Sequence, residues 1–554
     1  MASLNILIGG ESFKELREHH LCYVDKTSFL EEMLNAIPAK VSLITRPRRF
    51  GKTLMMTMLQ EFFDIQKNSR ELFEGLAISK DARLCDEWMN QYPTLFLTLK
   101  GVEGNTFSEA TMFYRELAVR LCSDHEYLLE SSKVSRSDKT LLNNVLERTA
   151  DIADLAGCLQ VLSHALESHY GKPVILLIDE YDVPISWAEQ NGYYKEMIGF
   201  MRNMLGAALK TNPSLKFAVL TGCLRIARES IFTGLNNFRC YGIADDQFAS
   251  AFGFTSKEVD ELLISAEMPD KKVSIKEWYD GYRFGNEQEI YCPWDVLLYV
   301  DDLQRNPSAT PKAYWNNTSG NAIVKTLIAQ SSQEIRQKVE DLISGDAIEE
   351  HLAEDLTYDL VYENENNLWS MLYLTGYLTK APEQPDNGNT ALVIPNKEVR
   401  EIFTSTVTAW FHDSLRKRDL TPFVDAIWNG DTAAMQMTLN DILYDTISYH
   451  DSAESFYHGF LAGLIRGAGL AIKSNREHGL GRTDIVIEDG RNRRAIIIEI
   501  KKADAFNDLD HKADEALAQI DEKNYVAGLS PQIKTVIKYG IAFWKKECCV
   551  KLAQ

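Results

Sequence analysis

The segment from residue 41 to residue 65 constrains the fold more than any other part of the sequence. It begins with Val-Ser-Leu-Ile-Thr (41–45), a short apolar run of the kind that forms a buried strand. Arg-Pro-Arg-Arg-Phe-Gly-Lys-Thr (46–53) follows, and apolar residues then recur at helical spacing up to residue 65. A strand and a helix joined by a loop that ends in Gly-Lys-Thr place an anion site at the helix N-terminus. This order predicts an α/β fold with a phosphate site at the loop.

The loop matches the phosphate-binding pattern G-x-x-x-x-G-K-[ST] at its end, but Arg46 replaces the first glycine. Gly51 provides the last turn, Lys52 the charge for the β- and γ-phosphates, and Thr53 a hydroxyl ligand for Mg²⁺. The alternative is a basic turn before a helix, but the flanking strand and amphipathic helix are what the motif requires. We expect ATP to be bound by the loop residues Arg46, Pro47, Arg48, Arg49, Phe50, Gly51, Lys52 and Thr53.

A second constraint is the apolar run Val-Ile-Leu-Leu-Ile (174–178), which is followed by Asp179 and Glu180. Its continuous hydrophobicity is typical of a strand buried on both faces of a parallel sheet. From that position Asp179 would hold the Mg²⁺ shell, and Glu180 would polarise a water for attack on the γ-phosphate. A strand at 94–99 lies between the loop and Asp179, as in NTPases with an inserted central strand. The adjacent glutamate favours hydrolysis over binding alone; the alternative is an Asp-Glu pair that only ends a strand.

The next predicted strand, 215–222, ends with Thr221 and Gly222 and is followed by Arg225 and Arg228. A polar residue at this point is suited to sensing the γ-phosphate. Either arginine is suited to neutralising the charge that develops during hydrolysis, in its own site or in that of a neighbouring copy. We predict Arg225 as a catalytic residue, and a homo-oligomer would let it act in trans. Surface arginines without such a role are the alternative.

The strand pattern fades after about residue 245, and residues 256–450 are mostly helical by pattern. It returns at Thr-Asp-Ile-Val-Ile (483–487) and Ala-Ile-Ile-Ile-Glu-Ile-Lys (495–501). Asp489-Gly490 between them is the turn signal of a β-hairpin. A second small α/β region is therefore expected at the C-terminal end of the sequence.

Three charged residues converge on this hairpin. Glu499 and Lys501 share one face of their strand because side chains alternate, and Asp484 approaches Glu499 across the hairpin. Carboxylates suit Mg²⁺ or Mn²⁺ rather than zinc, and Lys501 can position or deprotonate a metal-activated water. We predict Asp484 and Glu499 as metal ligands and all three residues as catalytic. The alternative is a hairpin with ordinary surface charges.

Further residues would support this second site. Gln519 lies on a predicted helix that packs on the hairpin, with Tyr525 soon after it, and Glu454 lies on a predicted upstream helix. We expect Gln519 and Tyr525 to support the site and Glu454 to add a carboxylate. A basic rim for phosphates is expected from Arg491, Arg493, Arg494 and Lys502.

Several segments together resemble known families. RPRRFGKT, LLIDEYD, ESIFTGLNNF, WYDGYRFG and YCPWD, within about residues 5–300, resemble the AAA-ATPase-like family, whose own loop fits the arginine at position 46. The order GRxD, turn, ExK and AxxQI, within about residues 450–550, is similar to the PD-(D/E)XK nuclease superfamily. The resemblance implies a P-loop NTPase (AAA-like, ASCE) parallel sheet followed by an α/β nuclease domain. It also implies ATP, a divalent metal and Asp484, Glu499 and Lys501 as the nuclease residues.

Charge and composition limit the remaining choices. The formal net charge is −21, but residues 450–554 hold 16 Lys or Arg against 15 Asp or Glu, so the acidity lies in the rest of the chain. Any nucleic-acid site must therefore be local. Nine cysteines without a CxxC pair indicate reduced thiols, and no signal peptide or membrane-spanning run is recognised, which predicts a cytoplasmic protein without a membrane partner.

We expect an ATPase-like domain at 1–250, a mostly helical lid or linker at 251–445 and a nuclease domain at 446–554. The function predicted from this arrangement is metal-dependent cutting of nucleic acid under ATP control, with DNA favoured over RNA. Genome maintenance and defence against foreign DNA both fit. The alternative is a nucleotide-dependent switch whose nuclease fold only binds nucleic acid.

Overall fold

The computed structural model describes residues 4–35, 39–225, 231–232, 238–315, 333–353, 356, 365–416, 419–446, 454–478 and 481–553. The chain divides into two compact units. The N-terminal unit consists of Met1–Thr318 and Glu349–Arg400, and the C-terminal unit consists of Ser319–Ile348 and Glu401–Gln554.

The N-terminal unit contains a large sheet, two layers of helices and a region of short strands and helices. Its strands are β1 (Val41–Thr45), β2 (Thr94–Thr98), β3 (Val174–Asp179), β4 (Leu215–Gly222), β5 (Phe238–Tyr241), β6 (Phe254–Thr255), β7 (Tyr282–Phe284), β8 (Glu287–Tyr291), β10 (Thr379–Lys380) and β11 (Thr390–Val393). Its helices are α1 (Phe13–Glu18), α2 (Ser28–Asn35), α3 (Lys52–Phe63), α4 (Ala82–Trp88), α5 (Phe107–Ser123), α6 (Arg136–Leu146), α7 (Ile152–Tyr170), α8 (Val183–Gln190), α9 (Tyr194–Leu205), α10 (Ser256–Ser265), α11 (Lys272–Tyr279), α12 (Pro293–Arg305) and α15 (Glu365–Leu374). The division between the units falls within β9 (Ile348–Glu350) and α16 (Lys397–Arg416).

The large sheet has the strand order β2-β3-β4-β1-β5, and every neighbouring pair is parallel. All residues of β1 and β3 are buried, as their continuous apolar sequences predict for central strands. β4 lies between β1 and β3, so the loop after β1 and the acidic end of β3 sit at the same edge of the sheet. This confirms the predicted α/β class. The strand between β1 and β3 in space is β4, whereas the predicted intervening strand 94–99 is β2, at the end of the strand order.

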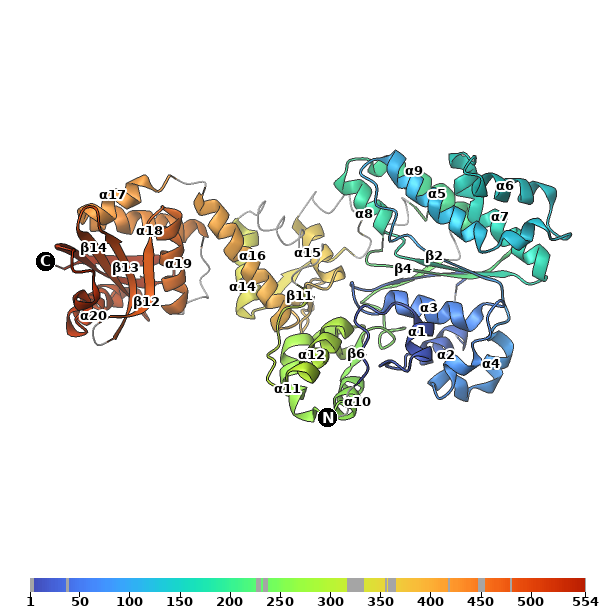
Figure 1. Ribbon diagram of the computed structural model, residues 1–554, viewed down its shortest axis with the longest axis horizontal. Helices are drawn as coiled ribbons and strands as arrows, with labels where there is room; N and C mark the ends of the chain where they lie inside the picture. The colour runs from blue at the N-terminus through green and yellow to red at the C-terminus, as the bar shows by residue number, and fades with distance from the viewer. Residues whose placement is uncertain are drawn as a thin grey trace. The chain divides into compact units, whose positions relative to one another are not determined.

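Helices cover both faces of this sheet. α3, which follows the loop, lies on one face with α1, α2 and α4, and α5, α6, α7 and α9 lie on the other (Figure 1). Alternate residues of the strands pack with the α5–α9 layer in one core, among them Leu43, Leu97 and Leu176. α5 stops at Ser123, and a short 3₁₀ turn follows it at Glu126–Leu129.

The expectation of a mostly helical region after residue 256 is only partly correct. β6, β8 and β7 form a small sheet, and β10 pairs with β11. β7 and β8 are joined through Gly285, whose positive φ of 53° and contact with Asp246 leave no room for a Cβ. The sequence pattern did not predict these short strands because their aromatic residues also pack well in helices. The buried residues of this region contact Leu4 and Ile6, so it packs with the N-terminal segment as part of the same unit.

The C-terminal unit is built around a second sheet. Its helices are α14 (Gln333–Ser344), α17 (Thr421–Asn429), α18 (Thr432–Thr446), α19 (Glu454–Gly467) and α20 (Leu509–Glu522). Its strands are β12 (Ile472–His478), β13 (Gly481–Asp489), β14 (Arg494–Lys502), β15 (Thr535–Trp544) and β16 (Glu547–Leu552), in that spatial order. β14 and β15 are parallel, and the other neighbouring pairs are antiparallel. The predicted hairpin is therefore confirmed as β13 and β14.

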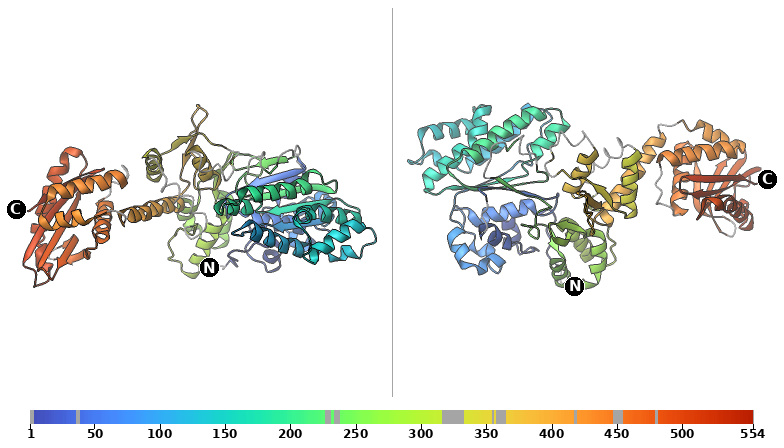
Figure 2. Two further views of the ribbon diagram at one scale, coloured as in Figure 1. Left: turned by 90° about the horizontal axis from the view of Figure 1, so that it is seen from above. Right: turned by 180° about the vertical axis from the view of Figure 1, so that it is seen from behind.

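The two faces of this second sheet carry different helices (Figure 2). Ile485, Ile498 and Ile500 share a core with residues of α17, α18 and α19. Val486 and Ile497 point to the opposite face and pack with Ile520 of α20. Because α17 and α18 are part of the sheet's own core, the compact body begins before residue 446, where the sequence pattern placed the boundary. Among the described helices, none has the length and hydropathy needed to cross a bilayer.

Candidate active sites

The loop between β1 and α3 has the backbone of a phosphate-binding turn. Gly51 has a φ of 83° and Arg49 a φ of 71°, both in the left-handed region. Lys52 is 6% exposed, and its Nζ donates hydrogen bonds to the carbonyl oxygens of Arg46 at 3.0 Å and Pro47 at 2.9 Å. The ammonium group is thus held by the main chain at the start of its own loop.

Asp179 is held directly beside this loop. It is fully buried, and Oγ1 of Thr53 donates to its Oδ2 at 2.8 Å. Oγ1 of Thr221, at the end of β4, donates to its Oδ1 at 2.5 Å. The predicted pair Thr53 and Asp179 is therefore brought together. Thr221, expected to sense the γ-phosphate, uses its hydroxyl on Asp179 instead.

Glu180 follows Asp179 in an unusual backbone conformation. Its φ is 52°, and the peptides around it are tied to the neighbouring strands. The N–H of Leu99 donates to the carbonyl of Asp179 at 2.9 Å, and the N–H of Tyr181 donates to that of Thr221 at 3.0 Å. Burial raises the pKa of Glu180, and the neighbouring Asp179 raises it further. A carboxylate with a raised pKa is suited to accept a proton from water.

Asp182, which the sequence did not single out, fixes a turn at the edge of this site. Oδ2 of Asp182 accepts hydrogen bonds from the N–H groups of Cys223 at 2.9 Å and Leu224 at 3.1 Å, which fixes the turn after β4. Gly222 lies against this turn, where a Cβ would stand 2.6 Å from the ring of Tyr181. In the sequence, Asp182 is the third acidic residue of Asp-Glu-Tyr-Asp (179–182), and this was the available signal for it.

Lys100 is a further residue that sequence reasoning missed. It comes just after β2, and its Nζ pairs with Glu11 at 2.6 Å. Its charge also lowers the pKa of Glu180, against the effect of burial. The signal was its position after the predicted strand 94–99, at the same sheet edge as Asp179 and Glu180.

Arg46 was predicted to bind nucleotide, and this prediction needs correction. Its guanidinium is fully buried, and Nη1 donates to the carbonyl oxygens of Tyr241 at 3.0 Å and Gly242 at 2.8 Å. Nη2 donates to the carbonyl of Phe248 at 3.0 Å. The side chain therefore points into the protein and does not face a phosphate.

Two more loop side chains pack against the rest of the unit. The guanidinium of Arg49 lies 4.5 Å from the ring centre of Trp294, and the ring of Phe50 meets Tyr282 edge-on at 5.0 Å. The side chains of Arg49 and Phe50 therefore support the loop by packing against Trp294 and Tyr282. Pro47, Arg48 and Gly51 remain predicted nucleotide-binding residues through their place in the loop.

Behind Arg49 lie two buried carboxyl groups. Asp295 and Glu398 are each 1% exposed, and Oε1 of Glu398 accepts a hydrogen bond from the N–H of Trp315 at 2.8 Å. Burial raises the pKa of Glu398, and the charge of Asp295 raises it further. Glu398 therefore has a higher pKa than an exposed glutamate.

Arg225 lies beyond the end of β4, on the side of β5. Burial raises the pKa of the Cys240 thiol on β5 to about 12, and the charge of Arg225 opposes this effect. Arg228 lies outside the described residues. The catalytic role of Arg225 stays a prediction.

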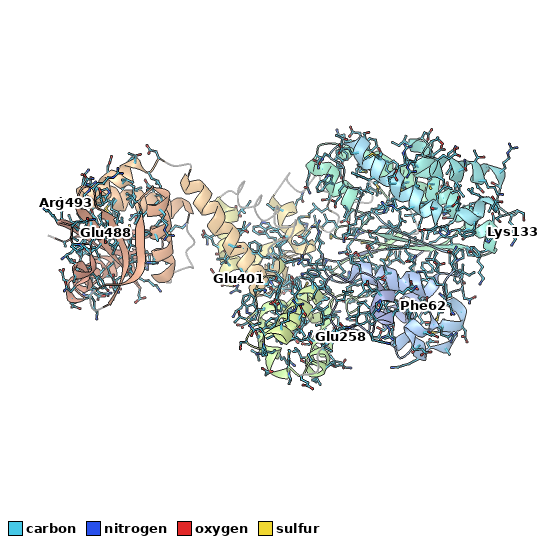
Figure 3. All side chains as sticks on the ribbon, in the orientation of Figure 1. Phe62, Lys133, Glu258, Glu401, Glu488 and Arg493 are labelled. Carbon is cyan, nitrogen blue, oxygen red and sulfur yellow. The ribbon has the colours of Figure 1, made fainter. Side chains whose placement is uncertain are left out.

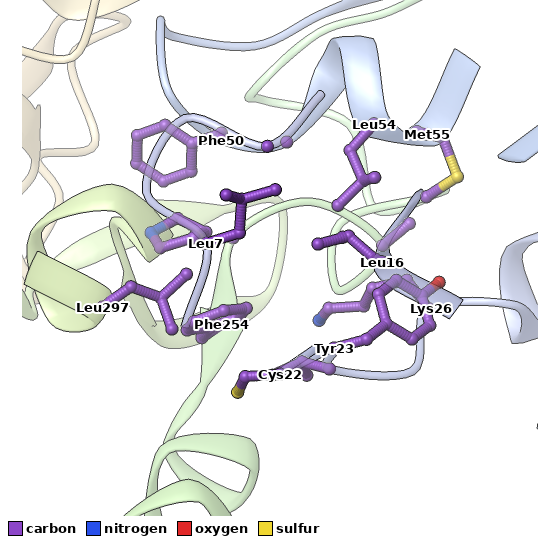
Figure 4. Close-up of a pocket in the computed structure, with 16 residues that line it drawn as sticks. Leu7, Leu16, Cys22, Tyr23, Lys26, Phe50, Leu54, Met55, Phe254 and Leu297 are labelled. Carbon is purple, nitrogen blue, oxygen red and sulfur yellow. The ribbon is translucent and has the colours of Figure 1, made fainter. Parts of the chain in front are cut away.

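An apolar cavity of about 100 Å³ adjoins the loop. Its lining includes Gly51 and Leu54 of the loop and α3, Leu7 and Leu16 from the N-terminal segment, and Phe254 and Leu297 from the region after β5 (Figure 4). Lys26 also lines it, but its Nζ donates to the carbonyl of Ser250 at 2.8 Å and to Glu258 at 2.7 Å. The cavity therefore offers mainly apolar surface next to the phosphate loop.

The second candidate site lies on the β13–β14 hairpin. Ile485 pairs with Ile498, which puts Asp484 and Glu499 opposite each other on the face covered by α20. Oδ2 of Asp484 accepts a hydrogen bond from the N–H of Ile500 at 2.9 Å, and Glu499 is 2% exposed. The structure thus brings the two predicted carboxylates together.

The predicted supporting residues surround Glu499. Nε2 of Gln519 donates to Oε1 of Glu499, and it lies 3.2 Å from the hydroxyl of Tyr525. Nζ of Lys501 lies 3.9 Å from the same Oε1. Burial raises the pKa of Tyr525, and the nearby carboxylates add to the effect. Asp484, Glu499, Lys501, Gln519 and Tyr525 therefore form one cluster.

A glycine allows α20 to approach closely enough for this cluster. Gly540 on β15 pairs with Glu499, and a Cβ at Gly540 would lie 2.2 Å from the carbonyl oxygen of Ala513 on α20. Only glycine leaves space for the helix backbone here. Sequence reasoning missed Gly540, since the close approach depends on how strand and helix meet in space.

α19 contributes a residue that was not predicted. Nε2 of His458 donates to the carbonyl oxygen of Asp484 at 2.9 Å, so it helps to fix the strand at the site. Glu454 is the first residue of α19, and its side chain lies outside the described part of the structure. Its predicted role as a further carboxylate stays a prediction.

The expected basic rim is not beside this cluster. Arg491 and Arg493 lie in the hairpin turn, beyond the start of β14 at Arg494, which is itself roughly 16 Å along the strand from Glu499 at about 3.3 Å per residue. Figure 3 labels Arg493 and Glu488, which both belong to the turn end of this hairpin, where Glu488 pairs with Ala495. Arg494 pairs with Asp489 at 3.1 Å and stacks on Trp428 at 3.9 Å. Of the rim, Lys502 is near Glu499 in sequence, but alternation along β14 turns its side chain to the opposite face from Glu499 and Lys501.

Both sites offer oxygen ligands that suit a hard divalent cation. Thr53 with Asp179, and Asp484 with Glu499, provide the carboxylate and hydroxyl oxygens that Mg²⁺ prefers. Among the described residues, no group of three His, Cys, Asp or Glu side chains is placed to hold a metal ion. This donor set fits Mg²⁺, which usually keeps several waters and takes one or two carboxylates plus substrate phosphates.

Comparison with known families identifies two domains in the chain. Residues 7–232 match a family described as predicted AAA-ATPase, and residues 452–552 match the PD-(D/E)XK nuclease superfamily. The chain therefore carries an AAA-ATPase-like domain followed by a PD-(D/E)XK nuclease superfamily domain. This confirms the resemblance that the sequence motifs indicated.

Individual proteins that are similar to the chain include the following two. One is an uncharacterized protein in the vnfD 5′ region of Azotobacter chroococcum mcd 1, 23% identical over 98% of this chain and 97% of its own length. The other is the crystal structure of a Signal Transduction ATPase with Numerous Domains (STAND) protein with a tetratricopeptide repeat sensor from Pyrococcus horikoshii. That match has 13% identity and a TM-score of 0.25, and it covers 79% of this chain and 56% of that protein. A TM-score this low supports no inference.

Proposed function

We propose that this protein binds and hydrolyses ATP in its N-terminal unit and cuts DNA with Mg²⁺ or Mn²⁺ in its C-terminal unit, with ATP controlling the cut. The observation that carries the proposal is the cluster of Asp484, Glu499, Lys501 and Gln519. It combines opposed carboxylates with a lysine and an amide around one point. A protein that only bound nucleic acid would not need this set.

ATP would bind with its β- and γ-phosphates on the loop. Lys52 would exchange the carbonyls of Arg46 and Pro47 for phosphate oxygens. Thr53 and Asp179 would hold Mg²⁺, which neutralises phosphate charge. Glu180 would accept the proton of the attacking water, since burial and Asp179 raise its pKa.

The cavity beside Gly51 and Leu54 supports a position for the base. Its apolar lining suits the face of a purine ring, and it adjoins the loop that would hold the phosphates. Among its described lining residues, the ammonium of Lys26 is engaged by Ser250 and Glu258. Base selection would then depend on main-chain groups and shape.

In the second site, Asp484 and Glu499 would hold the cation, which activates a water and stabilises the phosphate as its charge grows. Lys501 would orient that water or take its proton, because its Nζ lies 3.9 Å from Glu499 on the same strand face. Gln519 and Tyr525 would keep Glu499 in place. His458 and the N–H of Ile500 would do the same for Asp484.

DNA is favoured over RNA as the substrate, with genome maintenance or defence against foreign DNA as the setting. A reducing compartment such as the cytoplasm is supported by nine cysteines that are all free thiols. The competing function is a nucleotide-dependent switch whose nuclease fold binds nucleic acid without cutting it.

The test is cleavage by the purified full-length chain. Supercoiled plasmid, linear duplex, single-stranded DNA and RNA of one sequence are incubated with Mg²⁺ or Mn²⁺, with and without ATP. We expect metal-dependent cutting of DNA whose rate changes at least threefold with ATP. Absence of cleavage for every substrate, with DNA still bound, would favour the switch.

A homo-oligomer is proposed as the form that would let Arg225 act on a neighbouring site. ATP turnover per chain should then rise with protein concentration, and Arg225→Ala should lower it. A constant rate per chain over a hundredfold dilution, with a monomeric mass throughout, would exclude this arrangement.

A further inference from the structure

Arg46 occupies the position where phosphate-binding loops of this pattern have their first glycine. Its main chain is tied on both sides. The N–H donates to the carbonyl of Gly222 at the end of β4 at 3.2 Å, and the carbonyl accepts from Nζ of Lys52 at 3.0 Å. The residue thus joins the phosphate loop, its lysine and the end of β4.

The side chain joins the loop to a third element, the 241–248 turn after β5. The Tyr241–Gly242 peptide accepts from Arg46 and donates its N–H to Asp245 at 2.7 Å. This peptide lies between a cation and a carboxylate, and both charges reinforce its hydrogen bonds. Glu32 accepts the N–H of Phe248 at 3.1 Å and so fixes the other end of the turn.

The guanidinium is buried with aromatic rings around it. It lies 5.3 Å from the ring centres of both Phe252 and Phe284. Burial lowers the pKa of Arg46 to about 10, which leaves it charged at neutral pH. A buried charge held by fixed carbonyl groups is costly to move, because it would lose its partners.

We propose that Arg46 is a positioning residue for nucleotide binding: it fixes the start of the phosphate loop to the 241–248 turn, the task that tight backbone packing at a glycine performs elsewhere. The inference rests on the proposed ATP site. The N–H groups of the loop bind phosphate best when they are already oriented toward it. An unanchored loop would have to become ordered in each binding event, and this ordering would reduce the binding free energy. The arginine therefore acts through the loop backbone without touching phosphate.

The decisive variant is Arg46→Gly, which restores the usual glycine. By sequence pattern it should be neutral or beneficial, whereas we expect the Kd for Mg-ATP and Mg-ADP to rise at least tenfold. Arg46→Lys keeps the charge with fewer donors and should fall between wild type and Arg46→Gly. The matched control is Arg305→Ala, since Arg305 is 73% exposed and pairs with Asp301 on the surface of α12. Calorimetric titration of the full-length variants measures these constants.

A readout independent of nucleotide separates this inference from the proposed function. Without ATP, backbone amide exchange at 46–53 and 241–248 should be at least tenfold faster in Arg46→Gly than in wild type, with β2 and β3 unchanged. If Arg46→Gly does not fold, Asp245→Asn weakens the same tie and should raise the Kd for ATP about threefold to fivefold.

Tight ATP binding by Arg46→Gly, or unchanged exchange in both segments, would overturn the positioning role. With Asp245→Asn as the test variant, an unchanged Kd for ATP would do the same. A wild type that binds neither ATP nor ADP would instead refute the ATP site, while the exchange comparison would still decide whether Arg46 anchors the loop.

Discussion

The two candidate sites of this chain are assembled in different ways. In the N-terminal unit, a contiguous loop at 46–53 meets two strand ends, and Lys52, Thr53 and Asp179 are already bonded to protein groups. In the C-terminal unit, the site is made of residues that are as far apart in the sequence as Asp484 and Tyr525. The register of the strands and a closely packed helix bring them together.

The two sites therefore depend on different structural supports. The loop site depends on local backbone shape and on the anchors behind it. The hairpin site depends on the distance between α20 and the sheet, which Gly540 sets. Damage to one kind of support should therefore leave the other site intact.

The largest expected effect separates the two sites completely. Asp484→Asn or Glu499→Gln should lower DNA cleavage at least 1000-fold, because a hard cation loses a charged ligand, with ATP hydrolysis unchanged.

Lys52→Ala should lower ATP turnover at least 100-fold and leave metal-dependent cleavage without ATP intact. Rates of both reactions in the same preparations measure this. Parallel loss of both activities in either variant would mean that the sites are not separate.

A smaller effect is expected within the loop site. Glu180→Gln should reduce ATP turnover about 100-fold to 1000-fold, since the water loses its proton acceptor. The Kd for ATP should change less than threefold, because Glu180 does not hold the phosphates. Single-turnover hydrolysis and equilibrium binding check the two parts. Turnover at the wild-type rate would remove Glu180 from this role.

The helix support of the hairpin site can be tested by Gly540→Ala. The added methyl clashes with the carbonyl of Ala513, so we expect a loss of about 1–3 kcal/mol in the stability of the C-terminal unit. Cleavage should fall more than ATP binding. Gly157→Ala on α7 is the control, because nothing lies near its Cβ, and it should stabilise by about 0.5–1 kcal/mol. Equal behaviour of the two variants in chemical denaturation would contradict the packing argument.

The smallest expected effect is a pH dependence behind the loop. Glu398 keeps its proton in the folded state at a pH where the unfolded chain has lost it. The free energy of unfolding should therefore fall as pH rises from the unfolded pKa, about 4.3, toward the raised folded pKa. Between pH 6 and 8 we expect a loss of about 1 kcal/mol, reduced by relaxation of the site.

Glu398→Gln provides the comparison for this effect. The amide cannot ionise but can still accept the N–H of Trp315, so the variant should lose less stability over the same pH range. Denaturation curves of both proteins at pH 6, 7 and 8 measure the difference. Parallel curves would show that Glu398 is ionised in the folded protein.

Much of the first site could be predicted from sequence because its parts lie in short contiguous motifs. β1, Lys52 and the Asp179 strand follow from apolar runs and residue spacing, and their meeting follows from the parallel sheet. The inward direction of Arg46 could not be predicted, since its partners at 241–248 lie far away in the sequence. In the second site, period-two alternation correctly placed Asp484, Glu499 and Lys501 on one face, but the roles of His458 and Gly540 depend on packing between elements.

The backbone at Glu180 has a consequence for natural selection. A glutamate with a φ of 52° is disfavoured by roughly 1–2 kcal/mol relative to a relaxed backbone, while glycine would adopt it freely. A drift toward stability would therefore favour glycine at this position. Under the proposed role of Glu180, selection for ATP hydrolysis would keep the glutamate at this position, and an inactive descendant would be free to lose it.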